Sequence, residues 1–358
     1  MCPGLDPSNG ATLPVCALLR ADAGPTIGLG HLWRCLSLGE ALRRSGAKCV
    51  FLTNGVTSIK DQVTAFGFDV ETLDGVEPGG VDDLAKTFAM AGQYPCDIVV
   101  VDSYSIGEDY LERLRGAGLF VVAIDDLAPH PFSCQVVANE GAHAHELPYR
   151  SSSGDTKFLL GPKYALLRPG FWEVPPRTVR RTVENVLVTL GGADRHNLMP
   201  RLLDLLDKLA GRFTVTAIVG PFFENRLEIE DTAKRCRRSV RLVNAPDSLR
   251  DLMLEADLAI SAGGHSVYEL AAAGTPVVTV QGADNQAGHL RTLAAEGVVR
   301  LGGGADEPGL LTGVEAATRW LLQDHGARIV MSTAGRGLVD GQGAIRLVQA
   351  IRALREVR

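Results

Sequence analysis

The chain has 358 residues and a formal net charge of −6 at pH 7; 46% of its residues are hydrophobic and 22% are charged. This length predicts two domains, each with enough apolar material for a core of its own. The acidic balance argues against nucleic acid as the main partner, and because no apolar run approaches the length of a membrane span we expect no membrane insertion.

The first residues and the cysteines give two further expectations. Residues 1–12 contain prolines and glycines but neither the basic nor the apolar region of a signal peptide, so we expect a disordered lead-in there. The seven cysteines are scattered, with no CxxC pair and no zinc-ligand spacing. Their odd number and lack of pattern fit a reducing compartment, and we predict a cytoplasmic protein.

The first half of the chain alternates apolar strands with amphipathic helices. Residues 98–101 are continuously apolar and β-branched, which is typical of a parallel strand covered on both faces. The alternation predicts an α/β domain with a doubly wound parallel sheet. The strands are expected at 15–20, 48–53, 68–73, 97–102, 119–124 and 135–138, and the helices at 32–44, 58–66, 82–91 and 108–115.

The loop after the first strand places a histidine at the start of a helix. Gly24, Gly28 and Gly30 let the backbone turn sharply and approach a ligand closely. The helix N-terminus offers N–H groups and a partial positive charge to a phosphate or a developing oxyanion. Because imidazole titrates near neutral pH, His31 is a candidate general base. The alternative is a histidine that caps the helix behind a structural glycine turn.

The second half repeats the same alternation after a break in composition. Residues 174–182 are rich in proline and arginine and predict a linker. Strands are then expected at 185–190, 213–219, 240–243, 258–261 and 277–280. We therefore predict two Rossmann-like domains, over 13–173 and 183–340, and a final helix within 341–358 that packs back across the hinge.

Two glycine turns of the second domain follow apolar strands. Gly191 and Gly192 come after the first of these strands, and Gly263 and Gly264 come after the fourth. Glycine backbone at the carboxyl end of a strand is where open α/β sheets bind ligands, and a glycine pair before a helix can hold phosphate. Purely structural turns of this kind are also common.

Polar residues beyond the second of these turns could complete a nucleotide site. Glu269 lies about one helical turn further on, where a carboxylate can accept both hydroxyls of a ribose, unless it is a solvated helix residue. Asn285 and Gln286 follow the next strand, where amides can bind sugar or phosphate oxygens, although Asn285 can also cap a helix. No HExxH or DxD run is present, so no metal is expected, and Asp125-Asp126 is interpreted as a turn or sheet-edge feature.

Together these segments resemble one known family, the UDP-2,4-diacetamido-2,4,6-trideoxy-β-L-altropyranose hydrolases of pseudaminic acid biosynthesis. That family is similar to the peptidoglycan N-acetylglucosaminyltransferase and shares its GT-B architecture, in which two Rossmann-like domains have parallel sheets facing across a cleft. The matching segments occur in the family's order over nearly the whole chain: Arg20-Ala21-Asp22, Gly28-Leu29-Gly30-His31 with Arg34, Val101-Asp102-Ser103-Tyr104, Ile124-Asp125-Asp126, Leu160-Gly161-Pro162 with Tyr164-Ala165-Leu166-Leu167-Arg168, Leu190-Gly191-Gly192-Ala193-Asp194, Ser261-Ala262-Gly263-Gly264 through Glu269, and Ala283-Asp284-Asn285-Gln286.

The resemblance implies a role for each candidate site residue. His31 would be the general base that activates water. The UDP-binding residues would be Gly191, Gly192, Gly263, Gly264, His265 and Glu269. Contacts to the sugar or the diphosphate would come from Arg20, Asp22, Gly28, Gly30, Tyr104, Asn285 and Gln286. His265 departs from the small hydroxyl residue that the family commonly carries there, and it could pair with phosphate or alter the sugar pocket.

The implied reaction is an inverting, metal-independent hydrolysis that releases UDP and 2,4-diacetamido-2,4,6-trideoxy-L-altrose. It would contribute to pseudaminic acid biosynthesis and flagellin glycosylation, with no cofactor and no obligate protein partner. The main alternative is a GT-B glycosyltransferase with a UDP-sugar donor, in which His31 deprotonates an acceptor hydroxyl. A non-catalytic sensor of nucleotide sugars is a third interpretation, and it would not need His31.

Overall fold

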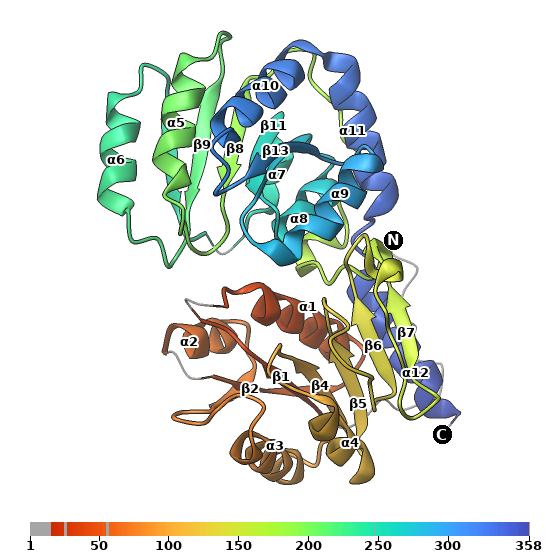
Figure 1. Cartoon of the computed structure of the whole chain (residues 1–358). Coiled ribbons are helices and arrows are strands. Elements are labelled where there is room, and N and C mark those ends of the chain that lie inside the picture. Colours follow the sequence, from red (N-terminus) through yellow and green to blue (C-terminus); the bar gives the residue numbers. More distant parts are fainter. Residues whose placement is uncertain (1–15, 25–26, 55–56, 247, 358) are drawn as a thin grey trace. The chain divides into compact units, whose positions relative to one another are not determined.

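The computed structural model describes residues 16–24, 27–54, 57–246 and 248–357, and the chain divides into two units (Figure 1). Unit 1 comprises Met1–Pro169 and Gln342–Arg358, and unit 2 comprises Gly170–Gly341. The lead-in predicted over 1–12 lies outside the described residues. Within these ranges lie four short 3₁₀ helices, η1 (Ala144–Glu146), η2 (Pro162–Tyr164), η3 (Pro169–Phe171) and η4 (Asp284–Gln286).

Unit 1 is built on a seven-stranded sheet in the order β3-β2-β1-β4-β5-β6-β7. Every pairing is parallel, and this confirms the predicted parallel sheet. Its strands are β1 (Cys16–Ala21), β2 (Lys48–Thr53), β3 (Asp69–Thr72), β4 (Ile98–Asp102), β5 (Phe120–Ile124), β6 (Val136–Asn139) and β7 (Lys157–Leu160). Its helices are α1 (Gly30–Arg44), α2 (Thr57–Ala65), α3 (Val81–Gln93), α4 (Glu108–Gly116) and α12 (Gly343–Glu356).

Strands β1 and β4 lie in the middle of this sheet. Every residue of β1 and β4 is buried, because helices cover both faces of the sheet. Helix α1 is buried over most of its circumference, since it packs against the sheet and also against α12. The last helix of the chain therefore belongs to unit 1.

Unit 2 contains a six-stranded sheet in the order β10-β9-β8-β11-β12-β13, again with every pairing parallel. Its strands are β8 (Asn185–Thr189), β9 (Thr214–Val219), β10 (Val240–Asn244), β11 (Leu258–Ala262), β12 (Val277–Gln281) and β13 (Arg300–Gly304). Its helices are α5 (Leu198–Lys208), α6 (Arg226–Arg235), α7 (Arg250–Glu255), α8 (Ser266–Ala273), α9 (Ala287–Ala295), α10 (Leu310–Gln323) and α11 (His325–Leu338).

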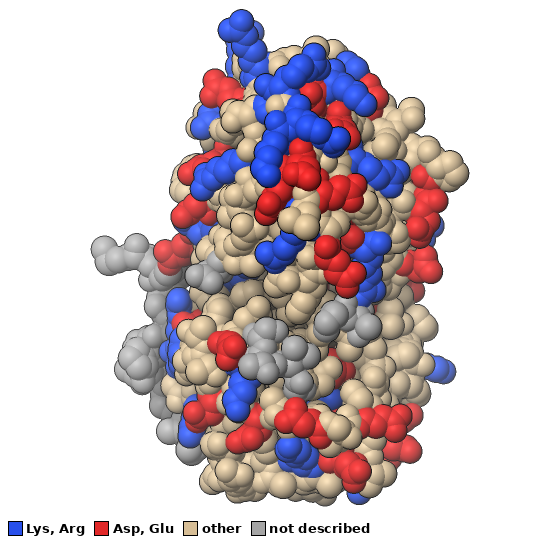
Figure 2. Space-filling view, turned by 90° about the vertical axis from the view of Figure 1, so that its left-hand side faces the viewer, with Lys and Arg blue, Asp and Glu red and all other residues tan. Residues whose placement is uncertain are grey.

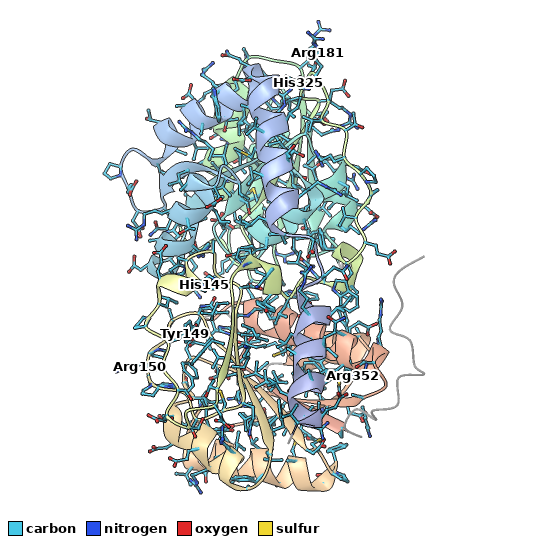
Figure 3. The ribbon with its side chains drawn as sticks, turned by 90° about the vertical axis from the view of Figure 1, so that its right-hand side faces the viewer. His145, Tyr149, Arg150, Arg181, His325 and Arg352 are labelled. Carbon is cyan, nitrogen blue, oxygen red and sulfur yellow. The ribbon has the colours of Figure 1, made fainter. Side chains whose placement is uncertain are left out.

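The stretch 174–182, predicted as a linker, is fixed to the surface of unit 2. Arg177 donates to main-chain carbonyls at the end of α7 and to the Thr275 hydroxyl. The buried Arg328 donates to the carbonyl oxygen of Arg181 at 2.8 Å, beside the start of α11 (Figure 3). The chain passes between the units at 169–170 and 341–342 instead, because these arginines anchor the proline-rich stretch.

Two edge strands, β7 and β13, are missing from the sequence prediction. Strand β7 is only four residues long and begins with an exposed lysine, so its apolar signal is weak. Strand β13 contains three consecutive glycines, which are rare in strands. A side chain at Gly302 would collide with Val314 of α10, so glycine there allows the helix to pack closely on the strand. In the described part of the chain, no helix is both long and apolar enough to cross a membrane.

Candidate functional site

In unit 1 the carboxyl ends of β1 and β4 lie side by side. The register pairs Ala21, the last residue of β1, with Asp102, the last residue of β4. The loop that follows β1 is closed by two backbone hydrogen bonds between Gly24 and Gly28, and Gly28 has a φ of +87° that favours glycine. Helix α1 then begins at Gly30, after the N-cap residue Leu29, whose side chain makes no capping hydrogen bond.

This turn brings His31 against the carboxylate of Asp102. His31 Nδ1 lies 2.5 Å from Asp102 Oδ1, and both side chains are buried. Since a carboxylate only accepts, Nδ1 carries the hydrogen, and Nε2 is the basic nitrogen of the neutral ring. Among the described residues, the hydrogen-bond contacts of His31 all involve Nδ1, so Nε2 stays available to a ligand or a water.

Arg34, one turn further along α1, fixes two carboxylates of this site. Its Nε and Nη2 donate to the two oxygens of Asp102 at 3.1 and 2.9 Å, and its Nη1 donates to Asp126 at 2.6 Å. Burial alone would lower the pKa of Arg34, but Asp102 and Asp126 raise it well above its ordinary value, so the guanidinium stays charged. Burial favours the protonated form of Asp126, yet Arg34 holds its pKa well below the usual range.

Tyr104 closes one side of the histidine. Its ring packs edge-on against His31 with centroids 4.5 Å apart, and its hydroxyl donates to Asp126 at 2.8 Å. Burial and the charge of Asp126 both raise the pKa of Tyr104, which therefore remains a hydrogen-bond donor at neutral pH. The structure thus brings the predicted site residues His31 and Tyr104 together, on a frame made by Arg34 and two carboxylates.

The acidic pair after β5 divides into two roles. Asp125 accepts from the backbone N–H groups of Leu127 and Ala128, so the prediction of a turn residue is confirmed for it. Asp126 also lies in the bend after β5, and it has a second role that the prediction did not include, because its carboxylate joins Arg34 and Tyr104 beside His31.

Arg20 does not have the position that the sequence predicts. Its side chain is completely buried, and it donates to Asp83 through Nε and Nη2 and to Asp22 at 2.6 Å. With its guanidinium held by two carboxylates, Arg20 cannot contact a sugar or diphosphate in this conformation. Asp22 accepts from Arg20, and from Ser103 at 2.5 Å. These two bonds fix Asp22 at the start of the loop that follows β1.

The second glycine turn of unit 2 gathers several predicted residues at the start of α8. The side chain of its N-cap residue, His265, makes no capping hydrogen bond. Gln286 accepts from the backbone N–H of Gly282 at 2.8 Å, and its amide nitrogen borders Gly264. His289 Nε2 lies 2.6 Å from the carbonyl oxygen of Gly263. A β-carbon at Gly263 would lie 2.5 Å from Leu290 Cδ1, so a larger residue there would displace the Leu290 side chain.

The first glycine turn of unit 2 differs, because the helix that follows it is already capped. Asp194 accepts from the backbone N–H groups of Leu198 and Met199, both at 2.8 Å. The carbonyls of Gly191 and Gly192 face the loop that follows β9, as the close approach of Gly220 and the Phe222 hydrogen bond show. Of the two turns, the one before α8 is therefore better suited to bind an anion.

Three other predicted residues of unit 2, His265, Asn285 and Glu269, differ from one another in their exposure to solvent. His265 is partly buried at the N-cap position of α8, and Asn285 is exposed in η4. Glu269 is completely buried, as are all residues from Val267 to Ala273, so its carboxylate does not face solvent. The contact of Glu269 with a ribose stays a prediction.

Sequence reasoning assigned no role to Asp102, Arg34 or His289. Asp102 could have been noticed as a carboxylate that ends a continuously apolar strand, and Arg34 as the residue one turn after His31. For His289 we find no sequence signal. Among the described residues, no group of three or more His, Cys, Asp or Glu side chains could hold a metal ion.

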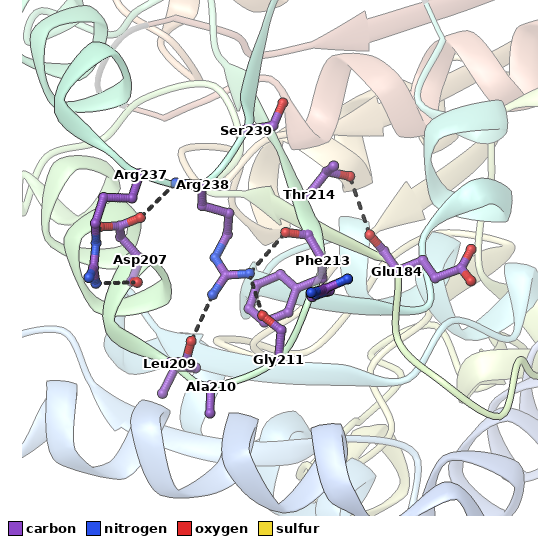
Figure 4. A pocket seen from close by; sticks show the side chains of 11 residues that line it. Glu184, Asp207, Leu209, Ala210, Gly211, Phe213, Thr214, Arg237, Arg238 and Ser239 are labelled. Carbon is purple, nitrogen blue, oxygen red and sulfur yellow. Dashed lines mark hydrogen bonds and ion pairs between the residues drawn. The ribbon is translucent and has the colours of Figure 1, made fainter.

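A separate hollow of about 740 Å³ lies in unit 2 at the amino ends of β8, β9 and β10, whereas the glycine turns lie at the carboxyl ends of strands (Figure 4). Arg238 spans it, donating to the carbonyls of Leu209, Gly211 and Phe213 while its guanidinium stacks on the Phe213 ring. These donors are used by the walls of the hollow itself, which suits a structural role. On the face shown in Figure 2, Lys and Arg side chains are interspersed with Asp and Glu.

Comparison with known proteins gives distant relatives. No family model matches the chain. It is 26% identical over 271 residues to the uncharacterized protein MJ1062 of Methanocaldococcus jannaschii, a match that covers 72% of this chain and 54% of that protein. It is 27% identical over 207 residues to the spore coat polysaccharide biosynthesis protein SpsG of Bacillus subtilis, covering 57% of this chain and 60% of SpsG. The chain thus spans little more than half the length of these relatives.

Among solved structures, MurG of Acinetobacter baumannii superposes with a TM-score of 0.68 at 16% identity, covering 94% of this chain and 99% of MurG. At this identity the likeness concerns the fold. Together with two parallel, Rossmann-like sheets of seven and six strands, it shows that the chain has a GT-B fold.

Proposed function

We propose that this chain hydrolyses a UDP-linked sugar at its anomeric carbon, with His31 as the general base. The observation that carries the proposal is the contact between His31 Nδ1 and Asp102, which leaves Nε2 as the basic nitrogen. A histidine oriented in this way by a buried carboxylate is a recurrent arrangement for proton abstraction.

In the proposed reaction, His31 Nε2 takes a proton from water as the water oxygen bonds to the anomeric carbon. The bond between that carbon and the diphosphate oxygen breaks, and UDP leaves with the electron pair. Asp102 stabilises the imidazolium that forms, and Arg34 keeps Asp102 in place by its two hydrogen bonds. General-base assistance of this kind contributes about 10²–10⁴-fold to the rate.

The UDP group is assigned to unit 2, at the start of α8. The turn at Gly264 and the start of α8 offer N–H groups and a partial positive charge for a diphosphate, whereas the N–H of Gly263 already donates to the carbonyl oxygen of Val280. Gln286 borders this turn, and its amide nitrogen could donate to the same oxygens, whereas His289 holds the turn through its contact with the Gly263 carbonyl oxygen. Gly191, Gly192, His265, Glu269 and Asn285 remain predictions of the resemblance.

The sugar is proposed from the resemblance to be 2,4-diacetamido-2,4,6-trideoxy-β-L-altropyranose. The similarity to SpsG, a protein named for spore coat polysaccharide biosynthesis, is consistent with carbohydrate chemistry but does not select the sugar. A glycosyltransferase would use the same His31 and Asp102 to deprotonate an acceptor hydroxyl, and it is the alternative to exclude.

Proton and phosphorus NMR of the purified protein with this UDP-sugar, excess EDTA and no acceptor tests the proposal. We expect free sugar and UDP from the wild type, and none from His31→Ala. An intact donor that still binds, and that is consumed only when an alcohol acceptor is added, would favour the glycosyltransferase.

A further inference from the structure

A small cavity in unit 1 lies next to Tyr104 and is not used by the proposed mechanism. Its volume is about 60 Å³, and the loops after β4 and β5 form its walls. Tyr104 and Leu127 are 46% and 41% exposed, whereas Leu111 and Phe132 are buried. The cavity therefore has a rim that reaches solvent and an apolar interior.

The polar side chains of this lining are already engaged with protein groups. His130 has a carbonyl oxygen within 2.8 Å of Nδ1 and another within 3.2 Å of Nε2. Asp125 accepts from two backbone N–H groups and from the Tyr149 hydroxyl at 2.7 Å. Ser103 donates to Asp22 and accepts from a backbone N–H. These bonds engage most polar groups of the lining, with the three bonds to Asp125 all ending on Oδ2. The rest of the lining is apolar, so the cavity suits an apolar group.

Tyr104 connects this cavity to the proposed catalytic base. One side of its ring packs on His31, with centroids 4.5 Å apart, and the same residue lines the cavity. Only the Tyr104 side chain therefore separates the cavity from His31, so a sugar bound at His31 would lie close to the cavity.

We propose that this cavity receives a methyl group of the sugar and makes the enzyme selective for it. The inference rests on the proposed function and deepens it, because it concerns which substituents the sugar carries. The methyl could come from a 6-deoxy carbon or from an acetamido group, and both sources share the same apolar chemistry. One methyl group in an apolar pocket changes the ratio of kcat/KM between two substrates by roughly 10–200-fold.

The test compares kcat/KM for matched UDP-sugars that differ in one substituent. One pair has methyl or hydroxymethyl at carbon 5, and two further pairs have acetamido or formamido at carbon 2 or carbon 4. The pairs are measured with the wild type and with Leu127→Trp, which fills the cavity mouth from an exposed position. Leu227→Trp in α6 of unit 2 is the matched control, because Leu227 is exposed and lies outside the cavity lining.

We expect the wild type to prefer the methyl-bearing member of one pair by at least about tenfold. Leu127→Trp should lose that preference and Leu227→Trp should keep it, and the affected pair identifies the source of the methyl. Leu127→Ala, which widens the mouth, should improve the use of a propionamido or ethyl analogue.

Two different failures can be told apart. Hydrolysis with the same ratios in the wild type and in both Leu127 variants would overturn the assignment of the cavity while leaving the proposed function in place. A wild type that hydrolyses none of these compounds would overturn the proposed function, and with it this inference.

Discussion

Arg34 holds Asp102 by two hydrogen bonds, from Nε to Oδ2 at 3.1 Å and from Nη2 to Oδ1 at 2.9 Å. The planar guanidinium thereby fixes the plane of the carboxylate that contacts His31. The third nitrogen of the same side chain reaches Asp126. One arginine therefore determines the orientation of two carboxylates and, through Asp102, that of the histidine.

Replacing Arg34 by lysine should break this arrangement while keeping the charge. An ammonium group cannot bond both oxygens of Asp102 and also reach Asp126, so we expect a loss of about 1.5–3 kcal/mol in unfolding free energy and a lower kcat. Urea denaturation and steady-state kinetics measure the two effects. Arg115→Lys is the control, because Arg115 makes a solvent-exposed pair with Asp155 that should contribute less than about 1 kcal/mol. Equal stabilities of the two variants would contradict this account.

Asp102→Asn should act mainly on the chemical step. The amide cannot stabilise an imidazolium at His31, so kcat should fall by about 10²–10⁴-fold with little change in the affinity for UDP. Asp155→Asn, at a surface carboxylate that pairs with Arg115, serves as the control. If the UDP affinity fell as strongly as kcat, the role assigned to Asp102 would be wrong.

Asp126 should make the stability of the protein depend on pH. Its pKa in the folded protein is held well below the usual value by Arg34, although burial opposes this. Ionised Asp126 therefore adds to the free energy of unfolding above its unfolded-state pKa of about 3.9. This stabilisation is lost as the pH falls toward the lower pKa that Asp126 has in the folded protein. Between about pH 5 and pH 2, the unfolding free energy should fall more steeply for the wild type than for Asp126→Asn. Parallel curves from denaturation at a series of pH values would refute this contribution.

The buried pair of Arg20 and Asp83 should be structural. Arg20→Ala leaves the buried carboxylates of Asp83 and Asp22 without their cation, so it should cost about 3–5 kcal/mol of unfolding free energy. Asp83→Ala should cost less, because Arg20 remains paired with Asp22. Urea denaturation measures this cost. If Arg20→Ala kept full stability but bound the UDP-sugar more weakly, the structural role would be wrong and the ligand contact that the sequence suggests would be supported.

At the start of α8, Gly264→Ala should weaken UDP binding without unfolding the protein. A β-carbon there meets no atom closer than 3.9 Å, so the fold can accept it, but it would narrow the space for a diphosphate. Gly309→Ala, at the N-cap of α10, has open space around its β-carbon and is the control. Isothermal titration with UDP should show at least about a tenfold loss for Gly264→Ala only. Unchanged affinity would remove the α8 turn from the nucleotide site.

The sequence predicts most of the sheets well, because buried parallel strands leave uninterrupted apolar runs. Strand β2 matches its predicted bounds, and β4 differs by one residue. The short, exposed β7 and the glycine-rich β13 lack that signal. The helical face that α1 presents to α12 likewise depends on residues about 300 positions apart, which no local pattern relates.

The candidate site is only partly predictable for the same reason. The glycine loop locates His31 at a helix start, but its partner Asp102 is 71 residues away in sequence. Arg20 is a charged residue in a strand and suggests a ligand contact. Only the packing of α3 against β1 shows that Asp83 neutralises it.

Hydrolysis in ¹⁸O-labelled water, followed by mass spectrometry of both products, tests the central claim most directly. If His31 activates water against the anomeric carbon, one ¹⁸O atom should appear in the released sugar and none in UDP, and His31→Ala should give neither product. Label in the UDP would show attack at phosphorus, and release of sugar by His31→Ala at the wild-type rate would show that this histidine is not the base.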